Sequence, residues 1–331
     1  MLLELFLLLC LIGIFKFVIS WLVSPQVLKL EGKHVLITGG SSGIGKAMAK
    51  EAIRRGAVVS IMARNSTKLE AAKVDLEKVA GNNFKPVCIV SVDVAGDYEE
   101  VQKAVQKAED KQGPVNMLIN CAGIGVAKTF EDLKIDEFKK LMNLNYFGSV
   151  QTTKAVISKM KEQGGGRIVF ISSQAGQLGL FGYTGYAASK FALRGLAESL
   201  QMEVRPYNIY VTVAHPPDTE TPGFEEEERN KPEETKLISG TSGLFKPEAV
   251  AKQILQDSVN GRFCSYIGLD GWMLANITCG MSPVHSMCDA IQQVLTVSVF
   301  RLVSFFYLCQ FTGIVRKCKA KRDKEQKEKM E

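Results

Sequence analysis

The chain alternates short apolar runs with longer amphipathic stretches over most of its length. Runs rich in Val and Ile predict buried strands, and stretches with apolar residues three and four apart predict helices. We expect strands near residues 34–38, 57–62, 86–92, 116–120, 167–172, 209–214 and 263–268. We expect helices near residues 43–55, 66–79, 97–111, 136–162, 184–204 and 247–259. Strands that are apolar on both faces and joined by helices indicate an α/β fold with a doubly wound parallel sheet of seven strands.

Two apolar segments flank this alternating region. The first, residues 1–24, is almost wholly apolar and long enough to cross a bilayer. It lacks the basic start and the small-residue cleavage site of a signal peptide, so we expect an uncleaved transmembrane anchor. Positive charge follows this segment and is absent before it, which predicts that the next domain faces the cytosol.

The second apolar segment covers residues 271–315 and precedes a basic tail at 316–331. Arg301 interrupts it and would cost about 2.5 to 3.5 kcal/mol at the centre of a bilayer. Re-entrant or interfacial helices, a hairpin of two spans, and a soluble helix pair packed on a dimer partner all agree with this pattern. The tail holds eight Lys or Arg against four acids, which predicts a cytosolic location.

The formal net charge of +6 therefore belongs mainly to the tail, and nucleic-acid binding is not indicated. The eight cysteines are scattered without C-x-x-C or metal-ligand spacing, which is typical of a reducing compartment and predicts no metal site. The region between the apolar segments, residues 31–270, is long enough for one α/β domain with a large core.

A glycine-rich turn follows the first predicted strand and opens the first predicted helix. The segment T-G-G-S-S-G-I-G at 38–45 has glycines where the chain must turn tightly, approach a pyrophosphate and pack a helix closely. The helix N-terminus then faces the phosphates. We therefore expect a dinucleotide-binding Rossmann fold. The expected contacts are Gly39, Ser41, Ser42, Gly43, Ile44 and Gly45.

The end of the second predicted strand indicates which dinucleotide binds. Enzymes that use NAD usually place an acid there to bind the ribose hydroxyls, whereas this chain has Ala63 followed by Arg64. A guanidinium can hold a 2′-phosphate with two hydrogen bonds, so we predict NADPH, with Ser41, Asn65 and Lys68 as helpers. The alternative is an ordinary surface arginine.

Three polar groups near the fifth predicted strand can carry proton chemistry. Tyr186 and Lys190 lie four apart on a predicted helix, so their side chains stack on one face. A phenol has an ordinary pKa of about 10 and becomes a usable acid near neutrality when an ammonium stabilises the phenolate. Ser173 ends the strand and can hydrogen-bond the oxygen that Tyr186 protonates. Y-x-x-x-K alone is common on solvated helices, but its combination with the glycine turn is a strong signal.

With both motifs in this order, the sequence resembles the short-chain dehydrogenase/reductase family. The resemblance implies that Tyr186 donates a proton, Ser173 steadies the developing negative charge, and Lys190 lowers the tyrosine pKa and holds the nicotinamide ribose. It also implies that Asn145 holds a water that relays protons to Lys190, with Asn143 as the competing residue.

The resemblance assigns further cofactor contacts after the third and fourth strands. Asp93 and Val94 match the position that binds adenine, although an aspartate there also caps a turn. Asn120 closes the fourth strand and is expected to form a wall of the cofactor site, with a simple turn asparagine as the alternative.

A long connection follows the sixth strand. Residues 216–217 are Pro-Pro where the family usually has Pro-Gly, so the nicotinamide contact expected from Thr221 competes with one from Thr219. Residues 217–246 form a connection of the length that is commonly a lid. Its acidic run, 225–228, is predicted to be a solvated helical face, and attraction of a cationic substrate is the weaker alternative.

Over nearly its full length the sequence is similar to membrane-bound family members that reduce long-chain sphingoid ketones. The similarity rests on the N-terminal segment, S-S-Q-A-G-Q-L-G-L-F-G-Y before Tyr186, H-P-P-D-T-E-T-P-G-F, G-L-D-G-W-M-L and C-G-M-S-P. It implies NADPH-dependent ketone reduction in sphingolipid synthesis at the cytosolic face of the endoplasmic reticulum. The implied partners are the sphingoid ketone, membrane lipid and, through helices 136–162 and 184–204, a second copy of the chain. The alternatives are a reductase of a retinoid, steroid or acyl ketone, and a non-catalytic NADPH-binding scaffold.

Overall fold

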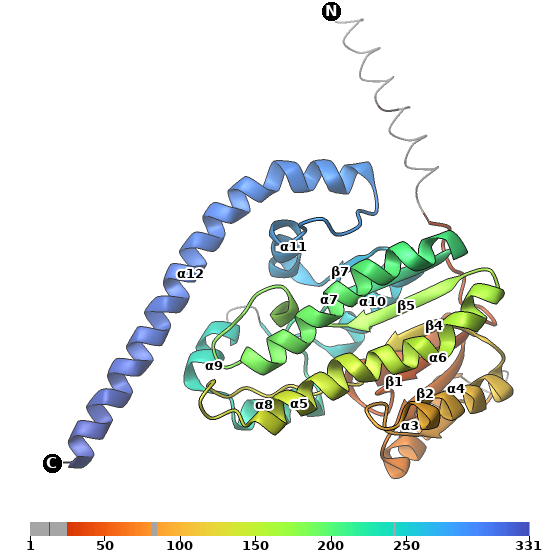
Figure 1. The fold of residues 1–331 in the computed structure, drawn as a ribbon, viewed down its shortest axis with the longest axis horizontal. Helices are drawn as coiled ribbons and strands as arrows, with labels where there is room; N and C mark the ends of the chain where they lie inside the picture. The colour runs from red at the N-terminus through yellow and green to blue at the C-terminus, as the bar shows by residue number, and fades with distance from the viewer. Residues whose placement is uncertain (1–12, 14–24, 81–84, 241–242, 331) are drawn as a thin grey trace, which may run out of the picture.

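The computed structural model describes residue 13 and residues 25–80, 85–240 and 243–330. Apart from residue 13, the predicted N-terminal anchor lies outside the described residues. The domain is built on a sheet of seven parallel strands in the order β3-β2-β1-β4-β5-β6-β7 (Figure 1). The strands are β1 (His34–Thr38), β2 (Val58–Ala63), β3 (Cys88–Ser91), β4 (Val115–Asn120), β5 (Gly166–Ile171), β6 (Ile209–His215) and β7 (Cys264–Tyr266). Every predicted strand is present, and the predicted doubly wound α/β fold is confirmed.

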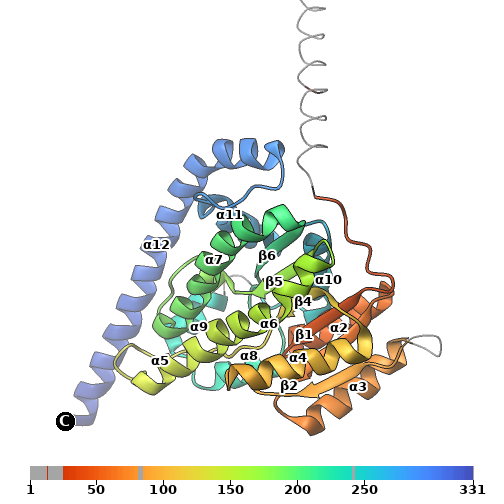
Figure 2. The same ribbon diagram turned by 45° about the vertical axis from the view of Figure 1, so that its right-hand side comes forward.

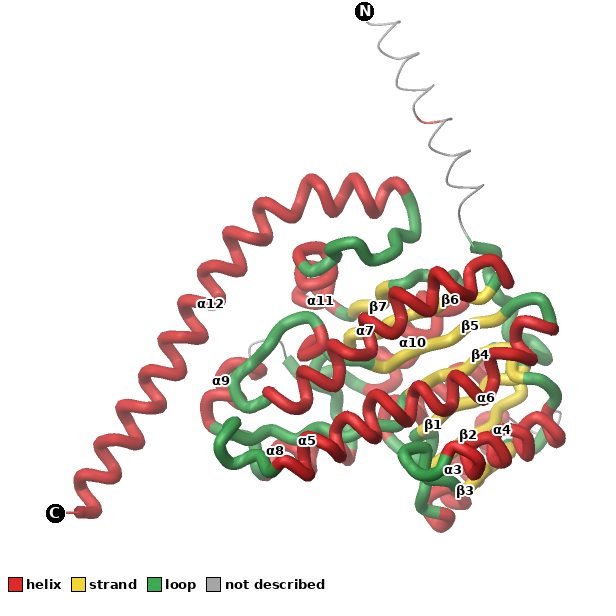
Figure 3. Tube along the Cα trace, in the orientation of Figure 1, coloured by secondary structure: helices red, strands yellow, loops and turns green. Residues whose placement is uncertain are grey.

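Helices cover both faces of the sheet and bury the strands between two apolar cores (Figure 3). The helices on one face are α2 (Gly43–Arg54), α3 (Ser66–Ala80) and α10 (Pro247–Val259). The helices on the other face are α4 (Tyr98–Gln112), α6 (Gly148–Glu162) and α7 (Thr184–Val204). This two-sided burial explains why the strands read as continuous apolar runs in the sequence.

The order of the sheet reverses between β1 and β4, because β1 pairs with β2 on one side and with β4 on the other. The turns that leave these two strands meet there. A Cβ atom built on Gly39 would lie 2.9 Å from the backbone nitrogen of Ala122, and Gly39 has a φ of +67°. Only glycine fits this close approach. A crevice at such a reversal is where ligands bind in open α/β sheets.

The predicted helix 136–162 is one helical segment with an irregular turn in its middle. α5 (Ile135–Leu141) continues through a π-helical turn (Met142–Phe147) into α6. Turns of this kind are frequent at functional sites. This turn buries Asn145 and leaves Asn143 exposed, which favours Asn145 over its competitor as the residue that faces the interior.

The long connection after β6 is folded. It contains α8 (Pro222–Arg229) and α9 (Glu233–Ser239). Pro222 occupies the first turn of α8, where a missing backbone N–H costs nothing, and the Thr221 hydroxyl caps that helix by accepting from the backbone N–H of Phe224 at 3.1 Å.

The C-terminal apolar segment forms a short helix, α11 (Gly268–Ile277), and a long one, α12 (Met287–Met330). α12 is continuous for 44 residues and α11 has 10, so this segment holds one described helix that is long enough to span a bilayer, and the number of membrane spans stays a prediction. The helix has no proline and a single glycine, Gly313, and therefore nothing that turns the chain back. Among the described residues, it is the helix whose length and composition would allow it to cross a membrane.

α12 touches the domain near both of its ends. At its start, Gln292 donates to Asn276 at 3.2 Å, and Phe300 packs edge-on against Trp272 with 5.0 Å between ring centroids. Near its end, Lys321 pairs with Glu233 of α9 at 3.0 Å, and Arg322 pairs with Glu234. α12 accordingly runs along one side of the domain in both views (Figures 1 and 2).

Candidate active site

A cavity of about 840 Å³ opens at the carboxyl ends of the strands. The turns that follow β1, β2, β3 and β4 line one end of it, and residues of α8, α11 and α12 line the other end. Ser173, Tyr186 and Lys190 lie on its wall between these two ends. We call the first the cofactor end and the second the substrate end.

The glycine turn forms the floor of the cofactor end. Gly43 has a φ of +53°, and a Cβ atom on Gly45 would lie only 2.5 Å from the carbonyl oxygen of Gly39. Larger side chains are therefore excluded from the turn, and the backbone N–H groups at the start of α2 remain open to an anion. All six residues expected from this motif line the cavity: Gly39, Ser41, Ser42, Gly43, Ile44 and Gly45.

The residues expected to select the cofactor also line this end. Arg64 is 62% exposed, and its Nη1 lies 3.8 Å from Asp93 Oδ2, so the guanidinium is available to a further anion. Asn65 and Lys68 are on the cavity wall, and the Asn65 side chain also accepts from the backbone N–H of Lys68 at 2.8 Å, at the start of α3. The first residue after β2 is thus a mostly exposed cation rather than an acid.

Asp93 and Val94 line the cavity after β3, and the Asp93 carboxylate also accepts from the Ala95 backbone at 3.0 Å. Asn120 does not line the cavity as expected. It is 2% exposed, and its side chain donates to the Thr153 hydroxyl at 3.0 Å, so it ties β4 to α6 behind the site. Because the buried amide finds its partners on α6, the wall of the site is formed instead by residues 121–125.

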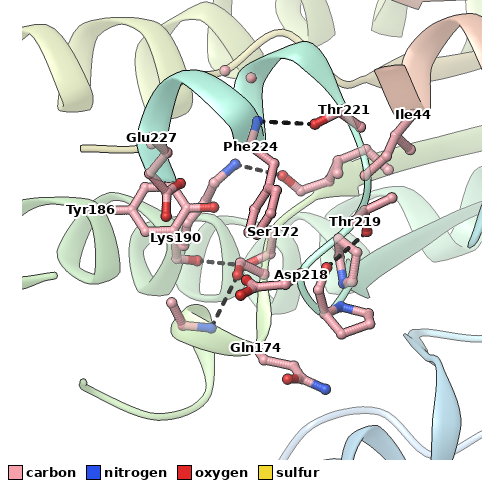
Figure 4. A pocket seen from close by; sticks show the side chains of 18 of the residues that line it. Ile44, Ser172, Gln174, Tyr186, Lys190, Asp218, Thr219, Thr221, Phe224 and Glu227 are labelled. Atoms are coloured by element: carbon pink, nitrogen blue, oxygen red, sulfur yellow. Dashed lines mark hydrogen bonds between the residues drawn. The ribbon is translucent and has the colours of Figure 1, made fainter. Parts of the chain in front are cut away.

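Tyr186, Lys190 and Ser173 all line the cavity, and Figure 4 shows Tyr186 close to Lys190. Lys190 is 6% exposed, and its ammonium donates to the Ile171 carbonyl at 2.8 Å and lies 5.7 Å from the centroid of the Tyr186 ring. Ser173 accepts from the Ala175 backbone at 3.1 Å, which fixes its side chain at the start of a short helical turn. The arrangement aims a phenol, a hydroxyl and an ammonium at one space.

Burial controls the proton affinities of this group. It raises the pKa of the Tyr186 phenol well above its ordinary value; the charge of Glu227 adds to the rise, and the hydrogen bond with Ser173 opposes it. Burial also lowers the pKa of Lys190 to about 8. The sequence analysis expected Lys190 to lower the pKa of Tyr186, whereas burial outweighs any such effect here. The phenol is therefore protonated at neutral pH but is a weaker acid than a free tyrosine.

Asn145 lies behind this group rather than on the cavity wall. Its side chain accepts from the backbone N–H of Ile124 at 2.9 Å and donates to the Ser189 hydroxyl at 2.9 Å. A Cβ atom on Gly123 would lie 3.0 Å from Asn145 Oδ1 and 3.4 Å from Lys190 Nζ. The amide and the ammonium therefore flank the same point of the loop after β4, and the water relay remains a prediction.

Both threonines proposed for the nicotinamide amide line the cavity. The Thr219 hydroxyl donates to the Pro217 carbonyl at 2.8 Å, whereas a Cβ atom on Gly43 would lie 3.1 Å from Thr221 Cγ2. Thr221 thus sits against the glycine turn, and the choice between the two remains a prediction.

The sequence analysis expected the acidic run of the connection to be a solvated helical face. The structure shows that this run is only partly solvated. Glu227 is 12% exposed, and its carboxylate accepts a hydrogen bond from the Tyr183 hydroxyl. Burial raises the pKa of Glu227, while Tyr183 and Lys231 oppose the rise. Figure 4 shows the side chain pointing from α8 toward Tyr186. The turn of α8 aims every third or fourth residue inward, so one acid in a run of four points into the domain and is largely shielded from water.

Sequence reasoning also missed the apolar part of the substrate end. This part consists of residues from α11 and α12, most of which belong to no motif: Met273, Leu274, Ile277, Phe300, Val303, Tyr307, Leu308 and Phe311. The one signal in the sequence was their spacing of three and four residues within a long apolar stretch. These residues extend the cavity beyond Tyr186 with an apolar wall.

The chain matches known proteins over most of its length. Residues 33–232 match the family model described as short chain dehydrogenase. A 3-dehydrosphinganine reductase from Danio rerio is 56% identical over 93% of this chain and 92% of its own. A 3-ketodihydrosphingosine reductase from Bos taurus is 54% identical over 93% of each chain.

Solved structures agree with the fold. A levodione reductase crystal structure has a TM-score of 0.66 and 27% identity, and it covers 74% of this chain and 99% of its own. An alcohol dehydrogenase from the archaeon Thermococcus sibiricus, complexed with 5-hydroxy-NADP, has a TM-score of 0.57 and 28% identity, covering 66% of this chain and 87% of its own. With the glycine turn and the Tyr186–Lys190 pair in one cavity, these matches show that the chain belongs to the short-chain dehydrogenase family of nicotinamide-dependent oxidoreductases.

Proposed function

We propose that this protein reduces the ketone of 3-ketodihydrosphingosine to dihydrosphingosine with NADPH, in sphingolipid synthesis. The observation that carries the proposal is a single cavity that runs from the glycine turn, past Tyr186, to the apolar residues of α11 and α12. The glycine turn suits a dinucleotide, Tyr186 suits a carbonyl group, and the apolar residues suit a long alkyl chain. Relatives that are 54% and 56% identical carry the corresponding names.

The residues of the chain act on the carbonyl oxygen. A bound NADPH supplies the hydride to the carbonyl carbon. Tyr186 donates its phenolic proton to the oxygen, and Ser173 hydrogen-bonds that oxygen as negative charge develops. Lys190 then stabilises the phenolate that remains, and Asn145 holds the loop after β4 beside it. Acid catalysis of this kind is worth about a hundredfold to ten-thousandfold.

We further propose that NADPH is preferred over NADH because of Arg64. The guanidinium is mostly exposed at the cofactor end and has only a long contact of 3.8 Å with Asp93. It can therefore turn to a 2′-phosphate without breaking a strong ion pair. Ser41 lies across the same end of the cavity and can share this phosphate.

We propose that α12 lies in a membrane surface rather than crossing the bilayer. It contacts the domain from Gln292 to Arg322, a length of about 45 Å at 1.5 Å per residue, so both ends stay with one domain. Its outward side exposes a continuous apolar face, spaced by three and four residues. This face consists of Ile291, Val294, Leu295, Val299, Leu302, Phe305 and Phe306. A bilayer is the solvent that such a face fits.

In this arrangement an alkyl chain can pass from the lipid to the cavity along α12. Phe300, Val303 and Phe311 line the cavity on the inward side of the same helix. Burying a chain from water gains about 0.8 kcal/mol per methylene, so a substrate of this kind resides in the membrane. We propose that the domain faces the cytosol, as the charge distribution around the apolar segments predicts. The resemblance to reductases of sphingolipid synthesis implies that the membrane is that of the endoplasmic reticulum.

The test is an NADPH-oxidation assay of the full chain in detergent with 3-ketodihydrosphingosine. We expect NADPH to be consumed in a one-to-one ratio with dihydrosphingosine formed, and NADH to be a poor substitute. Retinoid, steroid and acyl ketones serve as the comparison panel. Faster turnover of one of these ketones would identify another membrane-bound reductase, and NADPH binding without turnover of any ketone would identify a scaffold.

A further inference from the structure

Glu227 occupies an unusual place for an acid. It comes from α8, yet its carboxylate lies between the loop after β4 and α7, where it accepts from the Tyr183 hydroxyl. A Cβ atom on Gly125 would lie 2.1 Å from Glu227 Oε2, so the missing side chain of that glycine is what admits the carboxylate. Figure 4 shows it directed at the Tyr186 ring. The acid therefore borders the space in which the ketone must sit.

The charges around Glu227 do not balance. Lys231, whose side chain is fully buried, lies 3.3 Å from Asp218, 3.1 Å from Glu228 and 3.6 Å from Glu227. Three carboxylates thus share one ammonium, and Glu227 has the longest of the three contacts. In the described part of the chain, the hydrogen bond and the ion pair of Glu227 both use Oε1, whereas Oε2 lies against Gly125, which also lines the cavity. A second cation beside these carboxylates would reduce the excess of negative charge.

A second observation points to a polar ligand in the same cavity. Gln177 is 6% exposed, and among the described residues its Oε1 has no hydrogen-bond partner. The Nε2 of Gln174 is likewise buried and unpartnered in the described structure. Both residues line the cavity. Buried polar atoms are rarely left unpaired without a reason, because each costs about 1 to 3 kcal/mol.

The proposed substrate supplies the missing cation. 3-Ketodihydrosphingosine carries a primary amine on the carbon next to its ketone and a hydroxyl on the carbon after that, and the amine is protonated near neutral pH. Once Tyr186 reaches the carbonyl oxygen, the ammonium must lie a few bonds away, beside the phenol. We propose, on the basis of the proposed function, that Glu227 binds the ammonium of an amino ketone substrate and selects it over neutral ketones.

The polarity of the cavity agrees with this orientation. Glu226 and Glu227 of α8 line one part of the cavity, while most of the residues that α11 and α12 contribute are apolar, apart from Asp270 and Arg301. A substrate with a cationic head and an alkyl tail fits when its head points to α8 and its tail follows α12. The amides of Gln174 and Gln177 lie beside α11, since Gln174 Nε2 would be 3.6 Å from a Cβ atom on Gly271 and Gln177 donates to Thr278 at 3.3 Å. A neutral steroid or retinoid would leave the negative excess near Tyr186 uncompensated.

The experiment compares two substrates in two variants. The substrates are 3-ketodihydrosphingosine and 1-hydroxyoctadecan-3-one, which lacks the amine. In Glu227→Gln, which keeps an acceptor for Tyr183, we expect kcat/KM for the amino ketone to fall about 10- to 100-fold, mainly through KM. We expect kcat/KM for the ketone without an amine to stay the same or rise. The control is Glu225→Gln, an exposed acid on the same helix, which should change neither value.

Other outcomes overturn the proposal. An equal loss for both substrates in Glu227→Gln would mean that the carboxylate only holds α8 in place. If that variant does not fold, as judged by thermal unfolding and NADPH fluorescence, the substrate preference of the wild-type protein tests the proposal instead. Wild type must then prefer the amino ketone at least tenfold, and equal rates would refute the proposal. A wild-type protein that reduces other ketones but not 3-ketodihydrosphingosine would instead refute the proposed function.

Discussion

The two ends of the cavity are built in different ways. At the cofactor end, the contacts lie in short turns directly after β1, β2 and β3, within a few residues of a buried strand. At the substrate end, they come from segments that are far apart in the sequence. Tyr183 and Glu227 are 44 residues apart, and Gln177 contacts Thr278 across 101 residues. The residues that form the cofactor end are therefore close to one another in short segments of the sequence, whereas those that form the substrate end are not.

This difference has a physical origin. A dinucleotide is bound largely by backbone N–H groups and by space left at glycines, which a strand–turn–helix unit supplies by itself. A substrate is recognised by side chains that must be brought together, and any ordinary acid or apolar residue will serve if the fold places it there. Tyr186 lies between the two ends, and its replacement should cause the largest loss of activity among the variants below.

Tyr186→Phe removes the proton donor that both ends share. We expect kcat to fall about a thousandfold, because acid catalysis is lost, while the dissociation constant for NADPH stays within about twofold. NADPH oxidation and NADPH fluorescence measure the two effects. Tyr207→Phe, at a tyrosine that is 47% exposed, is the matched control. Normal turnover in Tyr186→Phe would show that the proton comes from elsewhere.

The free energy of unfolding should fall at low pH because of His215, which ends β6. Burial lowers the pKa of His215 to about 3, against an unfolded value of about 6.5. The unfolded chain therefore binds more protons between these values, and stability present above pH 6.5 is lost as the pH falls. From pH 7 to pH 5 this amounts to about 2 kcal/mol. Denaturant unfolding of wild type and His215→Phe measures it.

The variant His215→Phe cannot titrate at this position, so its stability should fall less over the same pH interval. The comparison cancels the contribution of His34, whose pKa burial also lowers and which is present in both proteins. An identical loss in both proteins would mean that His215 does not remain neutral in the fold.

Arg64→Ala should affect the cofactor end alone. We expect KM for NADPH to rise about 10- to 150-fold, since a charge-assisted hydrogen bond is worth about 1.5 to 3 kcal/mol, and KM for NADH to change little. Arg54→Ala, at an exposed arginine of α2 paired with Glu51, is the control. If both cofactors were weakened equally, Arg64 would be a structural residue rather than one that selects the phosphate.

Val303→Asp should affect the substrate end alone, with the smallest effect. It places a charge on the apolar wall that α12 contributes to the cavity. We expect kcat/KM in detergent to fall about tenfold for the long-chain ketone and little for a short-chain analogue, because fewer methylenes reach α12. Val299→Asp, on the outward face of the same helix, should leave both rates unchanged. An equal loss for both chain lengths would place the tail elsewhere.

Much of the fold and part of the site could be predicted from the sequence because they depend on local patterns. Val- and Ile-rich runs had to be buried strands, and the glycines at 39, 43 and 45 had to form a tight turn, since no other residue fits there. The spacing of Tyr186 and Lys190 placed them on one helical face. These inferences need only neighbours within one or two turns of the chain.

The tertiary structure alone decided what depends on distant partners. Asn120 turns to α6 because Thr153 is there to accept from it, and Glu227 is largely shielded from water because Tyr183 and Gly125 leave space for it. α12 returns to α9 because Glu233 and Glu234 meet its basic end. Each of these contacts joins residues more than thirty positions apart, and no local pattern of apolar and polar residues encodes which distant partner a side chain will meet.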